Sequence, residues 1–171
     1  MRRLVNALGL LACVAMLAYA WYAQTQLGLA PCPLCIFQRV GIAALGVLFL
    51  LATLHQPRRW GGRVYAVLLA AAALVTMGVA ARHVWIQHLP ADAVPACGAS
   101  LDYLLRVAPL TEVIRKVLTG SGECAKVTWT MFGLSMPLWV LLAAAALGCA
   151  GVWANLAATP GRRRAKAGAW G

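Results

Sequence analysis

Charged side chains are scarce in this sequence, and acidic side chains are scarcer still. Of 171 residues, 11% are charged, only four are acidic, and 63% are apolar. Soluble domains are usually about half apolar and about a quarter charged. The shortage of charge therefore excludes an ordinary soluble domain and predicts a single integral membrane domain over residues 1–171.

The sequence also lacks the pattern of a nucleic-acid-binding protein, although its formal net charge is +11. Lysine and arginine gather at the ends of apolar stretches, and no basic face alternates with aromatic residues as a binding groove requires. We therefore expect no nucleic-acid partner. Internal repeats are absent as well, so nothing indicates a solenoid or a repeat array.

Long apolar runs are sufficient to cross a lipid bilayer at four places. A transmembrane helix needs about 20 predominantly apolar residues, and a single span can satisfy its backbone in lipid only as a helix. The predicted spans cover residues 4–22, 36–54, 64–81 and 137–156. We therefore predict an all-α membrane protein, a bundle of four transmembrane helices.

Basic residues predict how the spans are oriented, because cytoplasmic loops are enriched in lysine and arginine. The residues on the predicted cytoplasmic side are Arg2, Arg3, Arg58, Arg59, Arg63, Arg162, Arg163, Arg164 and Lys166. Two loops, residues 23–35 and 83–136, then lie outside with all the acidic residues, and both termini lie inside. Ala18-Tyr19-Ala20 is similar to a signal-peptidase site, but the apolar run before it exceeds the usual length of about 7–15 residues, so we expect it to be retained.

The second outer loop contains one amphipathic segment. Apolar residues recur there at helical spacing, and Gly120 and Gly122 end the pattern. The apolar positions are Leu110, Val113, Ile114, Val117 and Leu118. We expect a short helix in the membrane interface with this stripe facing the lipid; the alternative is a helix packed on another part of the loop.

Cys32 and Cys35 stand at the start of the second span, in the sequence Cys-Pro-Leu-Cys. A disulfide across so short a ring adds little stability, because the gain grows with loop length. Redox exchange is the better explanation. The helix amino terminus and Arg39, one turn beyond Cys35, both favour a thiolate. The alternative is that Arg39 merely extends to the interface.

Cys97 and Cys124 form a second candidate pair in the long outer loop. Closing that loop would stabilise the fold by about 3.5 kcal/mol on a chain-entropy argument, which would justify a purely structural disulfide. The CxxC pair on the same side favours a redox role instead. Four cysteines could also bind zinc, but their spacing is wide and disulfides persist outside the cytoplasm, so we expect no metal.

The remaining candidates are less specific. Cys13 and Cys149 fall inside the first and fourth spans, where we expect small packing residues with protonated thiols. His83 ends the third span at the outer face and is either a boundary residue or a hydrogen-bond donor to a ligand at headgroup depth. A covalent haem is excluded, because Ile36 rather than histidine follows Cys35.

These motifs together have a known precedent. The features are Cys32-Pro33-Leu34-Cys35 opening the second span, Arg39 behind it, a cysteine pair in the second outer loop, and the stretches 123–129 and 132–139 leading into the fourth span. In this combination, over nearly the whole chain, the sequence resembles the DsbB family of disulfide bond formation membrane proteins.

The resemblance implies a thiol:quinone oxidoreductase with two cysteine pairs. The loop disulfide of Cys97 and Cys124 would oxidise a DsbA-like thioredoxin-fold protein, with Cys97 forming the mixed disulfide. Cys124 would then exchange with Cys32, and Cys35 would face the quinone. Such a system keeps the bacterial periplasm oxidising.

The resemblance also implies a setting and an acceptor site. Arg39 matches a family arginine beside the quinone, which would be ubiquinone or menaquinone, and His83 lies near a family histidine at the same site. The protein would be a monomer in the bacterial inner membrane with its active cysteines in the periplasm. The competing hypothesis is a membrane scaffold protein with a passive loop disulfide.

Overall fold

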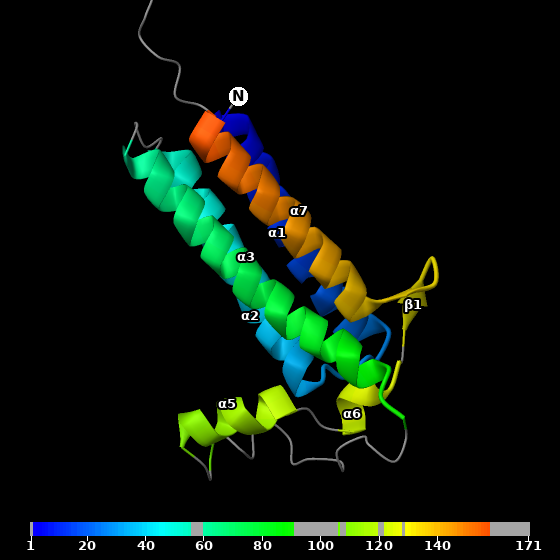
Figure 1. Ribbon diagram of the computed structural model, residues 1–171. Coiled ribbons are helices and arrows are strands. Elements are labelled where there is room, and N and C mark those ends of the chain that lie inside the picture. Colours follow the sequence, from blue (N-terminus) through cyan, green and yellow to red (C-terminus); the bar gives the residue numbers. More distant parts are fainter. Residues whose placement is uncertain are drawn as a thin grey trace, which may run out of the picture.

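Four long helices lie side by side and form the body of the molecule (Figure 1). They are α1 (Arg2–Gln26), α2 (Pro33–His55), α3 (Trp60–Gln87) and α7 (Met136–Ala157). The structure, a computed structural model, describes residues 2–55, 60–90, 106, 109–119, 122–127 and 129–157. Each predicted span lies inside one of these helices, and all four are long and apolar enough to cross a membrane. The predicted fold class is confirmed.

The helices pack in the order α1, α2, α3 and α7, and α7 closes the bundle against α1. The middle of the bundle is filled by one buried cluster, consisting of Cys13, Ile42, Leu45, Phe49, Leu69, Ala73 and Leu147. Cys13 is thus a packing residue, as predicted. The same prediction is wrong for Cys149, which is exposed on the outer face of α7.

Glycines allow the helices to approach closely at the middle of the bundle. A Cβ added to Gly9 would lie 2.8 Å from the ring of Phe49, and one added to Gly148 would lie 2.6 Å from Ala73 Cβ. Lipid offers no hydrophobic force to drive transmembrane helices together, so the helices associate through close packing. Small residues are common between them because they allow this close approach. The α3–α7 contact therefore depends on the absence of a side chain at Gly148.

Large apolar side chains cover the outside of the bundle. Leu4, Val67, Leu74 and Trp153 are each more than half exposed. A water-soluble monomer rarely exposes so large an apolar surface, whereas a bilayer covers it. The outward faces of the helices are therefore the surface expected to meet lipid.

A buried amide pair joins the two terminal helices at one end. Asn155 Nδ2 donates to Asn6 Oδ1 at 3.1 Å, and Asn6 Nδ2 donates to Asn155 Oδ1 at 3.5 Å. Both residues are almost fully buried. Buried polar groups need such partners, particularly in lipid.

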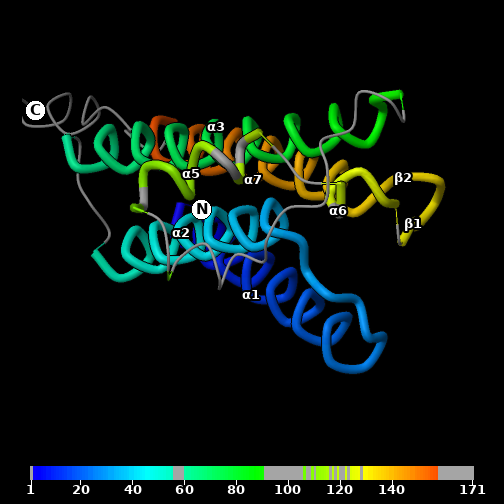
Figure 2. The backbone as a smooth tube through the Cα atoms, turned by 90° about the horizontal axis from the view of Figure 1, so that it is seen from below, coloured from blue at the N-terminus to red at the C-terminus, as the bar shows by residue number. Residues whose placement is uncertain are grey.

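A short helix, α5 (Leu110–Thr119), lies across the opposite end of the bundle, near the start of α2 (Figures 1 and 2). The next helix along the chain, α6 (Gly122–Ala125), lies at the same end. Helix α5 is the predicted amphipathic helix. Val113 and Val117 are buried against Leu34 of α2 and Ile86 of α3, while Ile114 remains 37% exposed. The expectation that the apolar stripe faces the lipid is therefore wrong for Val113 and Val117, which contact protein because the ends of α2 and α3 offer apolar side chains there.

A short hairpin with strands of two residues each precedes α7 and is a small addition to the predicted all-α fold. Strands β1 (Thr130–Met131) and β2 (Leu134–Ser135) pair antiparallel. Phe132 and Gly133 form the turn with positive φ angles of 54° and 76°, the backbone conformation that tight hairpin turns favour. Trp139 Nε1 donates to the Met131 carbonyl, which ties the hairpin to α7.

Candidate active site

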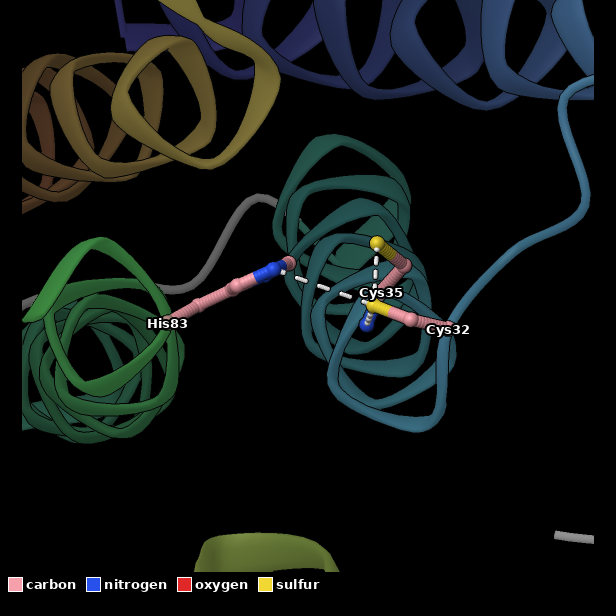
Figure 3. A group of neighbouring side chains, drawn as sticks. All are labelled: Cys32, Cys35 and His83. Carbon is pink, nitrogen blue, oxygen red and sulfur yellow. Dashed lines mark hydrogen bonds between the residues drawn. The ribbon is translucent and has the colours of Figure 1, made fainter. Parts of the chain in front are cut away.

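The CxxC motif lies at the amino terminus of α2 (Figure 3). Cys32 precedes the helix and acts as its N-cap, because its Sγ accepts a hydrogen bond from the backbone N–H of Cys35 at 3.3 Å. Pro33 occupies the first helical position, where its missing N–H costs nothing. The Sγ atoms of Cys32 and Cys35 lie 2.8 Å apart as free thiols. The local sequence thus places two sulfurs together at the positive end of a helix dipole.

Cys124 brings a third sulfur to the same place. It lies on α6, is almost fully buried, and packs with Leu34 and Ile86 at the ends of α2 and α3. The Cys32 thiol contacts both the Cys124 and the Cys35 thiols. These contacts, with Cys124 the first and burial a further cause, raise the pKa of Cys32 above its usual range. Cys32 is therefore the middle sulfur of three.

Cys97 lies outside the residues that the structure describes. Three of the four cysteines predicted for the site are brought together. The pairing of Cys97 with Cys124 stays a prediction.

His83 reaches the cysteines from α3, as Figure 3 shows. Its Nε2 lies 3.8 Å from Cys32 Sγ and 3.2 Å from the Cys124 carbonyl oxygen. On the other side of the ring, Nδ1 lies 3.0 Å from Gln38 Nε2 of α2. His83 is buried, so it is more than a boundary residue: it links α2, α3 and α6 beside the sulfurs.

Arg39 lies near the CxxC motif but is directed toward α1. Its Nη1 donates to Gln24 Oε1 at 2.6 Å, and its Nη2 donates to the Ala20 carbonyl at 3.1 Å. We expected it to be a partner of Cys35, and its hydrogen bonds in the described structure go to α1 instead. The side chain is long enough to reach across to α1, whose last turns offer two oxygen acceptors.

A cavity of about 600 Å³ lies beside the cysteines and is lined by α1, α2, α3, the hairpin and the start of α7. Its walls are mostly apolar, and its polar lining residues include Cys32, Cys35, Gln38, Arg39, His83, Gln87 and Lys126. Small-molecule sites are typically apolar cavities of about 300–1,000 Å³ with a few converging polar groups. The cavity thus has the size and the lining of a site for a small, largely apolar ligand that carries a polar group.

Sequence reasoning missed two residues that shape this site. Gln38 holds His83, and Gln24 holds Arg39. The signal for Gln38 was present, because a polar side chain inside an apolar span is costly and usually functional. Gln24 lies beyond the predicted end of the first span, so its position gave no such signal.

The same groups could also hold a metal ion. The ligand atoms of Cys32, Cys35 and His83 all lie within 4.8 Å of one another. Two thiolates and an imidazole are a donor set that suits zinc. They are equally the groups that thiol–disulfide exchange requires, so the geometry alone admits both chemistries.

Taken together, the fold and the site define a multi-pass membrane protein with a dithiol at the mouth of an apolar cavity. The sequence profile described as "Disulfide bond formation protein DsbB" matches residues 2–154. Two relatives named "Disulfide bond formation protein B" illustrate the similarity. The protein from Nitrosococcus oceani is 49% identical over 88% of this chain and 89% of its own length. That from Xanthomonas axonopodis pv. citri is 54% identical over 79% of each chain.

This chain therefore belongs to the DsbB family. It is a disulfide bond formation protein, and its activity is that of a disulfide-forming oxidoreductase acting with a partner protein. The resemblance inferred from the sequence is confirmed.

Proposed function

We propose that this protein is a thiol:quinone oxidoreductase that reoxidises a DsbA-like thioredoxin-fold protein and passes two electrons to a membrane quinone. One observation carries the proposal: Cys32 contacts Cys124 on one side and Cys35 on the other, and Cys35 lines the apolar cavity. A chain of sulfurs that ends at a lipid-side cavity is suited to moving electrons from a soluble dithiol to an apolar acceptor.

The proposed setting is the bacterial inner membrane, with the chain acting as a monomer and its cysteines in the periplasm. Arg2 and Arg63 support this orientation, because they lie at the starts of α1 and α3, on the cytoplasmic side predicted from the basic residues. The cysteine cluster lies at the opposite end of α3, next to His83. An oxidising compartment also suits the use of disulfides.

The proposed relay begins at the loop disulfide. A thiolate of the reduced partner attacks Cys97, forms a mixed disulfide and releases Cys124 as a thiolate. Cys124 attacks Cys32 of the Cys32–Cys35 disulfide, so that a Cys32–Cys124 disulfide forms and Cys35 leaves as a thiolate. The observed contact of Cys32 with both other sulfurs supports this order.

The return steps restore both disulfides. The second partner thiolate displaces Cys97 and leaves as the oxidised partner. Cys97 attacks Cys124 and releases Cys32, which then closes the Cys32–Cys35 disulfide and delivers two electrons. A quinone in the cavity would take these electrons with two protons and leave as the quinol.

The cavity residues fit this acceptor. The guanidinium of Arg39 would stabilise negative charge that develops on a quinone oxygen, and its hydrogen bonds to α1 hold it in place beforehand. The apolar walls from α1 and α7 would receive the tail of ubiquinone or menaquinone. His83, which also lines the cavity, would hydrogen-bond a carbonyl or a leaving thiolate.

The test is turnover of purified protein with a reduced thioredoxin-fold protein and a soluble quinone analogue. One quinol should form for each partner disulfide. Cys35→Ser should abolish turnover, whereas Cys149→Ser, which changes an exposed cysteine of α7, should not. Normal turnover by the Cys35→Ser variant would refute the proposal.

A metal-binding function is the second candidate, because Cys32, Cys35 and His83 form a possible ligand set. It predicts stoichiometric zinc in the purified protein and no disulfide that can be titrated. A passive scaffold instead predicts that the labelling of Cys32 and Cys35 does not respond to reductant. When the protein is quenched with acid and then labelled in denaturant, the thiol:quinone function predicts that both cysteines are labelled after reduction and are protected again when quinone is added.

A further inference from the structure

Gln38 is buried inside α2, one turn after Cys35, and its side chain makes one polar contact with another helix. Its Nε2 lies 3.0 Å from His83 Nδ1, and only 4% of the residue is exposed. A buried amide within a membrane helix is costly unless it is bonded. The contact with His83 therefore accounts for a polar residue in this position.

The two hydrogen bonds of His83 specify where its ring proton lies. The Cys124 carbonyl can only accept a hydrogen bond, so the nearby Nε2 of His83 must be the protonated nitrogen that donates to it. In the neutral ring, Nδ1 is then an acceptor, and the Gln38 amide nitrogen can donate to it. The carbonyl is a backbone group, so this assignment does not depend on which way the amide is turned.

We propose that Gln38 is a positioning residue that holds His83 in the Nε2–H tautomer, with that N–H aimed at Cys124 and Cys32. The inference rests on the proposed relay and adds a residue to it. Nε2 lies 3.8 Å from Cys32 Sγ, so a small shift brings the N–H from the Cys124 carbonyl to the Cys32 sulfur.

The step that benefits is the release of Cys32. When Cys97 attacks Cys124, a Cys97–Cys124 disulfide forms, the Cys32–Cys124 bond breaks, and the electron pair remains on Cys32. A hydrogen bond from His83 Nε2–H stabilises this thiolate, since hydrogen bonds to charged acceptors are the stronger ones. The other tautomer would present a lone pair to the thiolate and oppose its release.

The tautomer is measured first in the resting protein by nitrogen NMR of ¹⁵N-labelled histidines, with His55→Gln and His88→Gln used for assignment. The wild-type spectrum should show Nε2 of His83 protonated and Nδ1 unprotonated. Gln38→Leu should give a mixture of tautomers. Gln38→Glu places an acceptor opposite Nδ1, so a proton should appear on that nitrogen as well.

Turnover with a thioredoxin-fold partner and a quinone analogue is measured on the same variants. Gln38→Leu should lower kcat about tenfold, which corresponds to losing one hydrogen bond at the transition state. Thr76→Val is the matched control, because Thr76 is an equally buried polar residue of α3 whose hydroxyl donates to the Ala72 carbonyl. It should change neither the histidine spectrum nor kcat.

A proton on Nδ1 alone in the wild type would overturn the inference, as would an unchanged spectrum in Gln38→Leu. A tautomer that changes while kcat does not would refute the role in the relay. The spectrum is recorded without turnover, so it remains informative if the wild type fails to reduce quinone, which would refute the proposed function instead.

Discussion

The guanidinium of Arg39 on α2 donates a 2.6 Å hydrogen bond to Gln24 Oε1 on α1. A second bond to the Ala20 carbonyl fixes the plane of the group. Both bonds turn the cation along the wall of the cavity rather than toward Cys35. The terminal helix α1 thus contributes directly to the place where the quinone is proposed to bind, although it carries none of the four candidate cysteines.

Gln24→Ala should weaken quinone binding more than chemistry. One of two bonds that orient Arg39 is lost, at about 1 kcal/mol, so KM for a quinone analogue should rise about fivefold with little change in kcat. Steady-state kinetics at varied quinone concentration measure this. Gln26→Ala, at an exposed position near the end of α1, is the control and should match the wild type. An unchanged KM in Gln24→Ala would show that Arg39 does not depend on this contact.

Cys32 should resist alkylation in the fully reduced protein. Its pKa is raised by contact with Cys124, then by Cys35 and burial, and only the thiolate reacts readily. Iodoacetamide labelling of Cys32, followed by mass spectrometry, should remain slow near the ordinary cysteine pKa of about 8.5. Cys124→Ala removes the largest cause and should move the labelling profile to lower pH. Rapid labelling of wild-type Cys32 at neutral pH would contradict the assignment.

The same raised pKa makes a prediction about stability. The unfolded chain loses the Cys32 proton above about pH 8.5 while the folded chain keeps it, so the unfolded state binds fewer protons there. The contribution is therefore fully present below that pH and is lost as the pH rises. The Tm of the reduced protein should fall between about pH 8.5 and pH 10, and it should fall less in Cys124→Ala. A wild-type Tm that rises over this pH range would contradict the predicted loss of stability.

Gly148→Ala should destabilise the α3–α7 contact. The added Cβ would lie 2.6 Å from Ala73 Cβ, which is too close without movement of a helix, and overpacking of this kind costs about 1–3 kcal/mol. Thermal unfolding in detergent should show a lower Tm. Gly78→Ala is the matched control, because a Cβ there meets nothing within 4 Å and alanine favours the helix. Equal Tm values for the two variants would argue against this packing.

The buried pair of Asn6 and Asn155 should show energetic coupling. Each single change to alanine removes the other amide's partner across the helices, although Asn155 keeps its bond to the Gly151 carbonyl, and should cost about 1–2 kcal/mol. The double change should cost less than the sum of the two, as expected for residues that share an interaction. A double-mutant cycle on unfolding free energies in detergent measures the coupling. Strictly additive values would mean that the pair contributes nothing beyond its separate parts.

The sequence was sufficient to predict the four long helices of this fold, because the length of an apolar run alone distinguishes a membrane helix. It was less informative about which side of each helix faces inward. Cys13 and Cys149 have similar surroundings in sequence, yet Cys13 is buried and Cys149 is exposed. Helices that are apolar on every side carry no periodic signal, so their rotation is decided by packing partners such as Gly148 and Ala73.

The part of the site that is formed by residues close together in the sequence was predictable. Cys32 and Cys35 are neighbours in sequence and required no knowledge of the fold. The partner of Arg39 did not follow from its spacing to Cys35, because the choice depends on acceptors supplied by α1. The network of Gln38, His83 and the Cys124 carbonyl joins three elements, and only their packing reveals it.

The most direct test of the central claim, that Cys32 is the middle sulfur of the relay, is disulfide mapping of the Cys35→Ser variant by mass spectrometry. With its CxxC partner removed, Cys32 should attack Cys124 of the Cys97–Cys124 disulfide and release Cys97 as a thiolate, so the variant should accumulate a Cys32–Cys124 disulfide and a free Cys97. A variant in which Cys32 remains a free thiol, or pairs with Cys97 instead, would contradict the account.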